Sequence, residues 1–371
     1  MEQKGSRREN WIDAAKGIAI LIVVLNHSGL VIPGVNFWGG MFYVPAFFLL
    51  AGYTYAPKEE TLWNFVKRKA KRLLVPYFAA NGLLFLFFLV WDFIRGTFQP
   101  VVSLISFLGI LYGRNQLIKG GRNFVVFNAP IPDVKLMINL NAPTWFLPAL
   151  FLVLVGADAL FRLMKGSKRR VNFFVAFSAL IMLIYHYLSP FLLPWCIDIL
   201  PYLLVFFLAG YAIKEEHLFE KLDGIPFAKR CGIVCGILAL TVAAGVFNGS
   251  YNLSLSYFGK TVSICMIAAV GSTCLLLLLL RLIEKKIPKV TALMGRLGRH
   301  TLSVLCWHYF VMQMFFAAAG IVIPDIWEGS SRVMNQQVLW FMQYVVLLCG
   351  MVVSVAVPIA GSLIYRKFTK D

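Results

Sequence analysis

The sequence predicts an all-α polytopic membrane protein with about ten transmembrane helices, and three observations predict it. Of the 371 residues, 60 % are hydrophobic and 14 % are charged, whereas soluble domains average about 45–50 % and about 25 %. The apolar residues form runs close to the roughly 20 residues that a helix needs to cross a bilayer. The net charge of +18 lies in short segments between these runs, which indicates membrane topology and anionic lipid rather than nucleic acid.

Ten apolar runs are long enough to cross a bilayer, and we expect each to form one helix. The expected spans are 11–32, 37–56, 73–94, 144–164, 171–188, 196–214, 229–248, 257–281, 301–323 and 337–365. No soluble segment is evident at either end. We therefore expect a single transmembrane domain over 1–371.

The distribution of basic residues predicts the orientation of these spans. With the amino terminus inside, 28 of the 35 Lys and Arg residues fall in cytoplasmic segments. Five of the remaining seven lie in one long outer loop, 95–143. This alternation follows the positive-inside rule through all ten spans. We therefore expect both the N-terminus and the C-terminus to be cytoplasmic.

The outer loop 95–143 contains one apolar stretch, 101–111. This stretch is too short to cross a bilayer. We therefore expect it to lie at the membrane interface.

Ionisable side chains are costly inside a bilayer, so they are the first candidates for a functional site. The first span carries Asp13, Lys16 and His27. At about 100° per residue, Lys16 and His27 lie about 20° apart around the helix, with Asp13 within about 60° of both and His27 roughly 16 Å deeper than Lys16. Gly17, near the same face, permits a close helix or ligand contact. The simpler alternative is an Asp13–Lys16 ion pair and a hydrogen-bonded buried histidine.

Basic residues cluster where the third span begins. Topology alone explains Lys67, Lys69 and Lys71, because such residues mark cytoplasmic segments. Arg68 and Arg72 are four residues apart, so both face one side of a helix as it enters the membrane. Guanidinium groups bind phosphate in bidentate fashion, which makes this pair a candidate for a phosphate-bearing ligand.

The remaining candidates stand alone in the sequence. Trp145 opens the fourth span on the outer side, where Trp is usually a membrane anchor. His308 is a second intramembrane imidazole, and without an evident partner it is more simply explained as structural. We assign no role to His186, His217 and His300. The chain has no phosphate-cradling glycine loop, zinc-spaced His/Glu pair or serine nucleophile elbow, and we expect no metal.

Five motifs occur in order along the chain. The first is Lys16, followed after ten residues by His27, and the second is the segment 47–53, Phe-Phe-Leu-Leu-Ala-Gly-Tyr. The third consists of Arg68, Arg72, Pro76 and Tyr77. The fourth is the segment 145–150, and the fifth is the segment 206–211 together with His308. Together they resemble the integral-membrane acyltransferase family three, and 145–150 resembles its branch of fucose and exopolysaccharide O-acetylases. The family usually has Arg where this chain has Lys16, and Lys lacks the planar fork of Arg.

The resemblance implies transfer of an acyl group, most often acetyl, from cytoplasmic acetyl-CoA to a hydroxyl of an extracytoplasmic or lipid-linked glycan. His27 would act as general base or as nucleophile, and the sequence leaves both open. Asp13 would orient or charge-balance Lys16. Arg68 and Arg72, with Lys16, would hold the phosphates of acetyl-CoA. The implied substrate-binding residues are Trp145, Tyr53 and His308.

The expected partners are therefore an acyl-CoA donor, a glycan acceptor and the lipid bilayer, with no nucleic acid. The expected location is the bacterial cytoplasmic (inner) membrane. The alternative is a secondary transporter or flippase of a small or lipid-linked sugar, whose intramembrane charges would form a proton relay or substrate site. Paired broken helices, which many transporters show, are not evident in the sequence.

Overall fold

The computed structural model describes residues 10–57, 59–120, 132–136, 141–323, 325–328 and 335–368. Within these ranges the chain forms fourteen α-helices, three short 3-10 helices and one two-stranded hairpin. The expected all-α class is confirmed. A helix satisfies its backbone hydrogen bonds within one segment, which is what a bilayer core without water requires.

The number of membrane-spanning helices also agrees with the expectation. Nine of the described helices are long and apolar enough to cross a membrane, or ten if one bent pair counts as a single span. That pair, bent by 47°, covers the expected span 37–56 and consists of α2 (Pro33–Phe42) and α3 (Pro45–Tyr53). Pro45 has no N–H to donate to the preceding turn, so the helix breaks there. The orientation of the termini stays a prediction.

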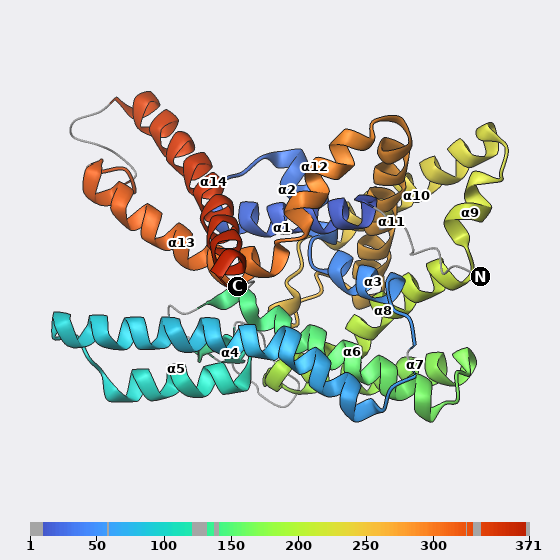
Figure 1. The fold of residues 1–371 in the computed structure, drawn as a ribbon, viewed down its shortest axis with the longest axis horizontal. Coiled ribbons are helices and arrows are strands. Elements are labelled where there is room, and N and C mark those ends of the chain that lie inside the picture. The colour runs from blue at the N-terminus through green and yellow to red at the C-terminus, as the bar shows by residue number, and fades with distance from the viewer. Residues whose placement is uncertain are drawn as a thin grey trace. The chain divides into compact units, whose positions relative to one another are not determined.

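Two compact units make up the chain, and each is described by itself (Figure 1). Unit 1 consists of 1–47 and 271–371, so it contains both ends of the colour bar, and unit 2 consists of 48–270. Helix α11 (Val262–Lys286) and helix α3 pass from one unit to the other. The single domain expected over 1–371 stays a prediction.

Unit 1 is built around the first helix, α1, which is more buried than any other described candidate span. Its other complete helices are α2, α12, α13 and α14. The bounds are α1 (Asn10–Ser28), α12 (Pro288–Gly298), α13 (Thr301–Val322) and α14 (Gln336–Phe368). Helix α1 packs along α12 and also contacts α13, and α13 packs along α14. An apolar cluster of Ile326, Leu339 and Val346 joins the segment after α13 to α14.

In unit 2, α6 packs against both α4 and α8, and α7 packs against α8. The helices are α4 (Leu62–Arg95), α5 (Pro100–Tyr112), α6 (Phe146–Leu163), α7 (Lys168–Leu188), α8 (Leu200–Glu215), α9 (Leu218–Asp223) and α10 (Phe227–Asn248). The short elements are β1 (Gln116–Ile118), β2 (Val134–Lys135), η1 (Ala142–Trp145), η2 (Pro194–Ile199) and η3 (Leu253–Leu255).

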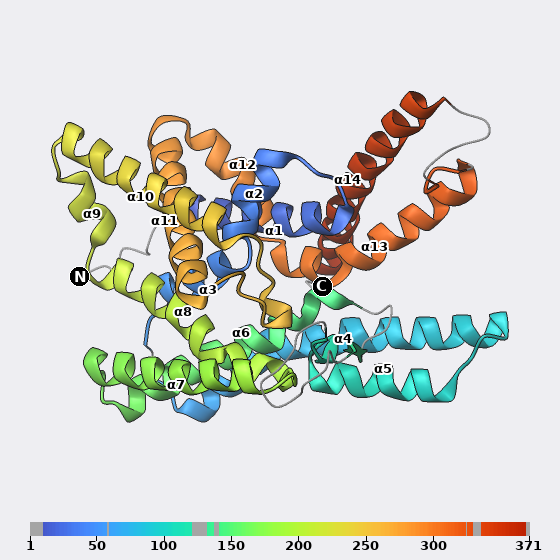
Figure 2. The ribbon, with the colours of Figure 1, turned by 180° about the vertical axis from the view of Figure 1, so that it is seen from behind.

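Helix α5 corresponds to the apolar stretch 101–111 of the expected outer loop, and it runs back alongside α4 (Figures 1 and 2). The Tyr77 hydroxyl of α4 donates a hydrogen bond of 2.8 Å to the carbonyl of Ile110. After α5, strand β1 pairs antiparallel with β2. The loop thus has a helix and a hairpin of its own, and its place at the membrane interface stays a prediction.

Two sequence motifs cross each other in unit 2. A side-chain Cβ on Gly52 of α3 would overlap the carbonyl group of Phe207 in α8, and a Cβ on Gly210 of α8 would overlap the carbonyl group of Leu49 in α3. The contact is therefore reciprocal: each glycine lies against the backbone of the other helix, at the residue three positions before that helix's own glycine. Small residues of this kind let two helix backbones approach closely in a membrane protein.

The crossing makes a prediction about stability. In Gly210→Ala the added methyl group meets the backbone of α3, and overpacking of this kind typically costs about 1–3 kcal/mol of the free energy of unfolding. Gly156→Ala in α6 is the matched control, because a Cβ there meets nothing within 4 Å. Thermal unfolding in detergent should show a lower midpoint for Gly210→Ala only. Equal midpoints for the two variants would show that the crossing is not close.

Candidate functional site

Two histidines far apart in the sequence lie together in unit 1. His27 is in the last turn of α1, and His308 is in α13. Their ring centroids are 5.5 Å apart, with an angle of 46° between the ring planes. The ring of Tyr309 lies edge-on to His27 at 5.6 Å. The structure thus gives His308 the partner that the sequence did not show.

The hydrogen bonding of His308 defines which nitrogen of its ring carries the proton. The side chain is 0 % exposed, and its Nδ1 lies 2.8 Å from the carbonyl oxygen of Val304. A carbonyl oxygen only accepts, so Nδ1 is the donor. In the neutral ring, Nε2 then has a free lone pair. This buried nitrogen has no hydrogen-bond partner in the part of the chain that the structure describes.

The first turns of α1 carry the other two candidates from the first span. The Lys16 ammonium lies 3.3 Å from a carboxylate oxygen of Asp13, whose side chain is almost completely buried. The ion pair of the simpler alternative is therefore present. A Cβ on Gly17 would lie 2.5 Å from the carbonyl oxygen of Met294, and a Cβ on Gly298 would overlap the carbonyl group of Asp13. The close approach expected at Gly17 is made by helix α12.

Sequence reasoning missed helix α12, since it treated 282–300 as a cytoplasmic connection. The helix begins with Pro288 in its first turn, where the missing N–H of proline has no helical partner to lose.

Arg296 on helix α12 and Arg299 after it are exposed. Burial, followed by the charges of Arg366 and Arg299, lowers the pKa of His300, so this ring is neutral at neutral pH.

Arg68 and Arg72 lie in unit 2, in the first turns of α4. This helix begins at Leu62, earlier than the expected start at 73, with the Thr61 side chain as its cap. The two arginines are therefore on one helix, as the spacing predicted. Arg68 forms an ion pair with Glu60. Arg72 is exposed, and none of the described residues forms an ion pair with it.

A buried carboxylate of unit 2, Asp158 in α6, was missed. It is 1 % exposed, accepts a hydrogen bond of 2.6 Å from the Tyr55 hydroxyl and pairs at 2.6 Å with Arg162 one turn later. Arg162 also donates to the backbone carbonyl of Glu60 at 2.7 Å. Asp158 lies inside the expected span 144–164, so the cost of intramembrane charge would have identified it.

Unit 2 also contains an ion pair that is buried on both sides, between Arg114 and Asp198. Arg114 also donates to the hydroxyl of Ser256 and to the carbonyls of Leu193 and Ser254. The guanidinium thus joins the segment after α5 to those around η2 and η3. No sequence pattern indicates that these segments lie close together, so this ion pair could not be predicted.

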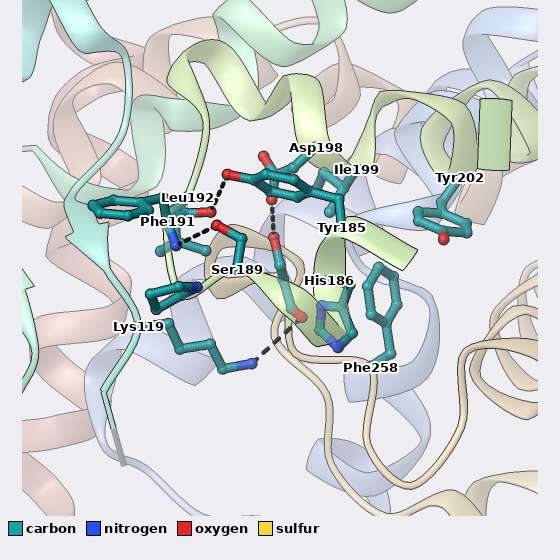
Figure 3. A pocket seen from close by; sticks show the side chains of 12 residues that line it. Lys119, Tyr185, His186, Ser189, Phe191, Leu192, Asp198, Ile199, Tyr202 and Phe258 are labelled. Carbon is teal, nitrogen blue, oxygen red and sulfur yellow. Dashed lines mark hydrogen bonds between the residues drawn. The ribbon is translucent and has the colours of Figure 1, made fainter. Parts of the chain in front are cut away.

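Beside this ion pair is a small cavity (Figure 3), and its lining includes Lys119, His186, Ser256 and Phe258. The Lys119 ammonium lies 3.4 Å from the Ser256 carbonyl, and the rings of His186 and Phe258 are 5.5 Å apart. At about 10 Å³ the cavity has the size of one water site. It is too small for a sugar ring in this conformation.

The two aromatic candidates of unit 2 are both buried. Trp145 is 9 % exposed and lies edge-on to the ring of Phe146 at 6.4 Å. Just before it, the side chain of Thr144 accepts a 3.0 Å hydrogen bond from Asn81 of α4. Tyr53, also 9 % exposed, ends α3 beside the crossing glycine. The substrate-binding roles of Trp145 and Tyr53 stay predictions.

A family model described as an acyltransferase domain matches residues 9–361. The chain belongs to acyltransferase family 3. No curated protein and no solved structure matches it. Together with the apolar helices, the match identifies a membrane acyltransferase, and the resemblance that the sequence motifs indicated is confirmed. The match runs through both units.

The site residues expected in this acyltransferase fall in both units. Asp13, Lys16, His27 and His308 belong to unit 1, in which the structure brings the two histidines together. The unit 2 residues are Tyr53, Arg68, Arg72 and Trp145. Within the described ranges, no three His, Cys, Asp or Glu side chains gather as a metal site would require. That the protein uses no metal stays a prediction.

The ion pair in α6 between the buried Asp158 and the partly exposed Arg162 allows a second stability test. Asp158→Asn keeps the shape of the side chain but removes the charge that faces Arg162, so we expect a loss of about 1–3 kcal/mol in the free energy of unfolding. Glu216→Gln is the control, because its pair with Lys168 is half exposed on both sides and exposed pairs contribute little. Unfolding of the purified protein measures both, and an unchanged Asp158→Asn midpoint would contradict a structural role for this pair.

Proposed function

We propose that this membrane acyltransferase transfers an acetyl group from cytoplasmic acetyl-CoA to a hydroxyl of an extracytoplasmic or lipid-linked glycan, in a bacterial cytoplasmic membrane. The observation that carries the proposal is the contact of His27 with His308, at 5.5 Å between ring centroids. Two imidazoles side by side within a membrane helix bundle are costly without a function. In acyl transfer, imidazole can serve as base or as nucleophile.

The position of His27 on α1 suits a donor that arrives from the cytoplasm. The basic inner end of that helix carries the Asp13–Lys16 pair, and His27 follows about 16 Å farther along the helix axis at 1.5 Å per residue. The phosphates of acetyl-CoA would stay at the cytoplasmic end, where cations neutralise them. The flexible pantetheine arm would then carry the thioester toward His27.

Among the cations proposed for these phosphates, Arg72 is the one that none of the described residues pairs. Lys16 and Arg68 already pair with the carboxylates of Asp13 and Glu60, and such pairing reduces the field that they offer to an anion. Arg72 is exposed on the same helix as Arg68. An exposed guanidinium can donate two hydrogen bonds to one phosphate.

For the acceptor, the proposal uses the residues expected from the motifs, Trp145, Tyr53 and His308. Aromatic faces suit the apolar faces of sugar rings. Because Trp145 and Tyr53 are only 9 % exposed, a sugar would contact a small part of each residue. A hydroxyl close to His308 would meet the buried ring nitrogen that lacks a partner.

The essential role of His27 is tested by substitution. We expect His27→Ala and His27→Asn to lose at least about 10²-fold in acetyl transfer, because general acid–base catalysis alone contributes that much. Acetyl transfer from labelled acetyl-CoA into membrane glycans, in proteoliposomes, measures the loss. His217→Asn, at an exposed position in unit 2, should keep the wild-type rate.

Monodisperse elution and an unchanged unfolding midpoint are required of each variant, so that lost activity reports chemistry. Turnover retained by folded His27→Ala would rule out His27 as the essential base or nucleophile. Sugar movement without acetyl transfer by the wild-type protein would instead favour the transporter or flippase.

The donor site is tested at Arg72. Arg72→Ala removes a charge-assisted contact with phosphate, so the Kd for acetyl-CoA should rise about tenfold. Lys71→Ala is the matched control, because Lys71 is the exposed neighbour whose charge topology alone explains. Isothermal titration with acetyl-CoA in detergent compares the two variants. Equal affinities in Arg72→Ala and the wild type would place the phosphates elsewhere.

A further inference from the structure

The buried Nε2 of His308 is a polar atom whose role the fold alone does not explain. Leaving a polar group buried without a hydrogen bond costs free energy, and native proteins rarely keep such groups. The rest of the ring is well placed: the side chain is fully buried and Nδ1 bonds to the Val304 carbonyl. The nitrogen that lacks a partner belongs to the ring that contacts His27.

We propose that His308 is a second catalytic group, whose Nε2 accepts the proton of the acceptor hydroxyl while His27 carries the acyl group. The inference rests on the proposed function and goes beyond it, since that function leaves the role of His27 as base or nucleophile open. It divides the two tasks between the two rings.

The tautomer of His308 suits it to accept a proton. Because Nδ1 donates to a carbonyl that is part of its own helix, the proton is held there and Nε2 remains a base. The same hydrogen bond becomes charge-assisted and stronger when Nε2 is protonated. The ring is also fixed by burial on all sides, and a base must be held within hydrogen-bond reach of the proton that it removes.

His27 differs from His308 in ways that suit a nucleophile. As a whole residue, His27 is only partly buried, whereas His308 is fully buried. The His27 ring contacts the rings of His308 and Tyr309. A nucleophile must be reachable by the thioester, whereas the base needs to reach only a small hydroxyl. The more exposed of the two residues is thus the one assigned to the acyl group.

The two half-reactions balance without any further reactant. In the first, a nitrogen of His27 attacks the thioester carbonyl; an N–C bond forms, the C–S bond breaks, and the N–H proton of His27 leaves with the sulfur as CoA thiol. In the second, the glycan oxygen attacks the acyl-imidazole; an O–C bond forms and the N–C bond breaks. The hydroxyl proton passes to His308 Nε2 and from there to His27, which restores both rings.

The experiment separates these half-reactions in the full-length protein. His308→Asn keeps an N–H that can replace Nδ1 as donor to Val304 but has no atom in place of Nε2. With labelled acetyl-CoA and no acceptor, we expect His308→Asn to release thiol at a rate within about threefold of the wild type. After glycan-bearing membranes are added, its enzyme-bound acetyl label should persist at least about 10²-fold longer.

Controls locate the label and test folding. The bound label should be released by hydroxylamine and be absent from His27→Ala, and His217→Asn should match the wild type in both steps. Wild-type turnover of the acyl label by His308→Asn would overturn the inference, as would equal loss of both half-reactions in a variant with an unchanged unfolding midpoint. If the wild-type protein transfers no acetyl group from acetyl-CoA to the glycan-bearing membranes, it is the proposed function that fails. Acetyl transfer by the wild type without any release of thiol before the membranes are added would overturn the inference alone.

Discussion

Water is absent from the hydrocarbon core of a bilayer, so every polar group that enters it must find its partner within the protein. The architecture of this acyltransferase follows from that constraint. Helices satisfy the backbone, and the buried carboxylates of Asp13 and Asp158 each pair with a cation on the same helix. The buried Arg114 pairs with Asp198 between two segments. In contrast to these paired groups, the buried Nε2 of His308 has no hydrogen-bond partner among the described residues.

Close helix packing, rather than water exclusion, must hold such a bundle together, because lipid tails are as apolar as the helix surfaces. Glycines provide the close approaches in both units. Gly298 brings α12 against the backbone of Asp13, and Gly52 and Gly210 let α3 and α8 cross. The motifs 47–53 and 206–211, which resemble signatures of an enzyme family, therefore act here as a packing pair, with Tyr53 buried beside the crossing.

The sequence alone predicted those features that depend on residues close together in the chain. Span length and helical period predicted the helices and the face shared by Asp13, Lys16 and His27, because both depend on neighbours within a few turns. The same reasoning missed α12, since eleven residues with a basic face do not form an apolar run. It applied the rule on intramembrane charge to the first span but not to Asp158. The contact between His27 and His308 was beyond reach, because it depends on how α1 and α13 pack and leaves no local pattern.

Two neutral imidazoles offer a physical reason why such chemistry can run inside a membrane. A charged intermediate would be strongly disfavoured in a low-dielectric site, and a single histidine that served as both nucleophile and base would have to build charge on one ring. With two rings, the proton of the hydroxyl is taken up by one as the other gives up its acyl group. Each half-reaction then begins and ends with both rings neutral. The paired Asp13 and Lys16 likewise add no net charge to α1. The second histidine therefore keeps the charge of the site constant while the acyl group passes from His27 to the glycan hydroxyl.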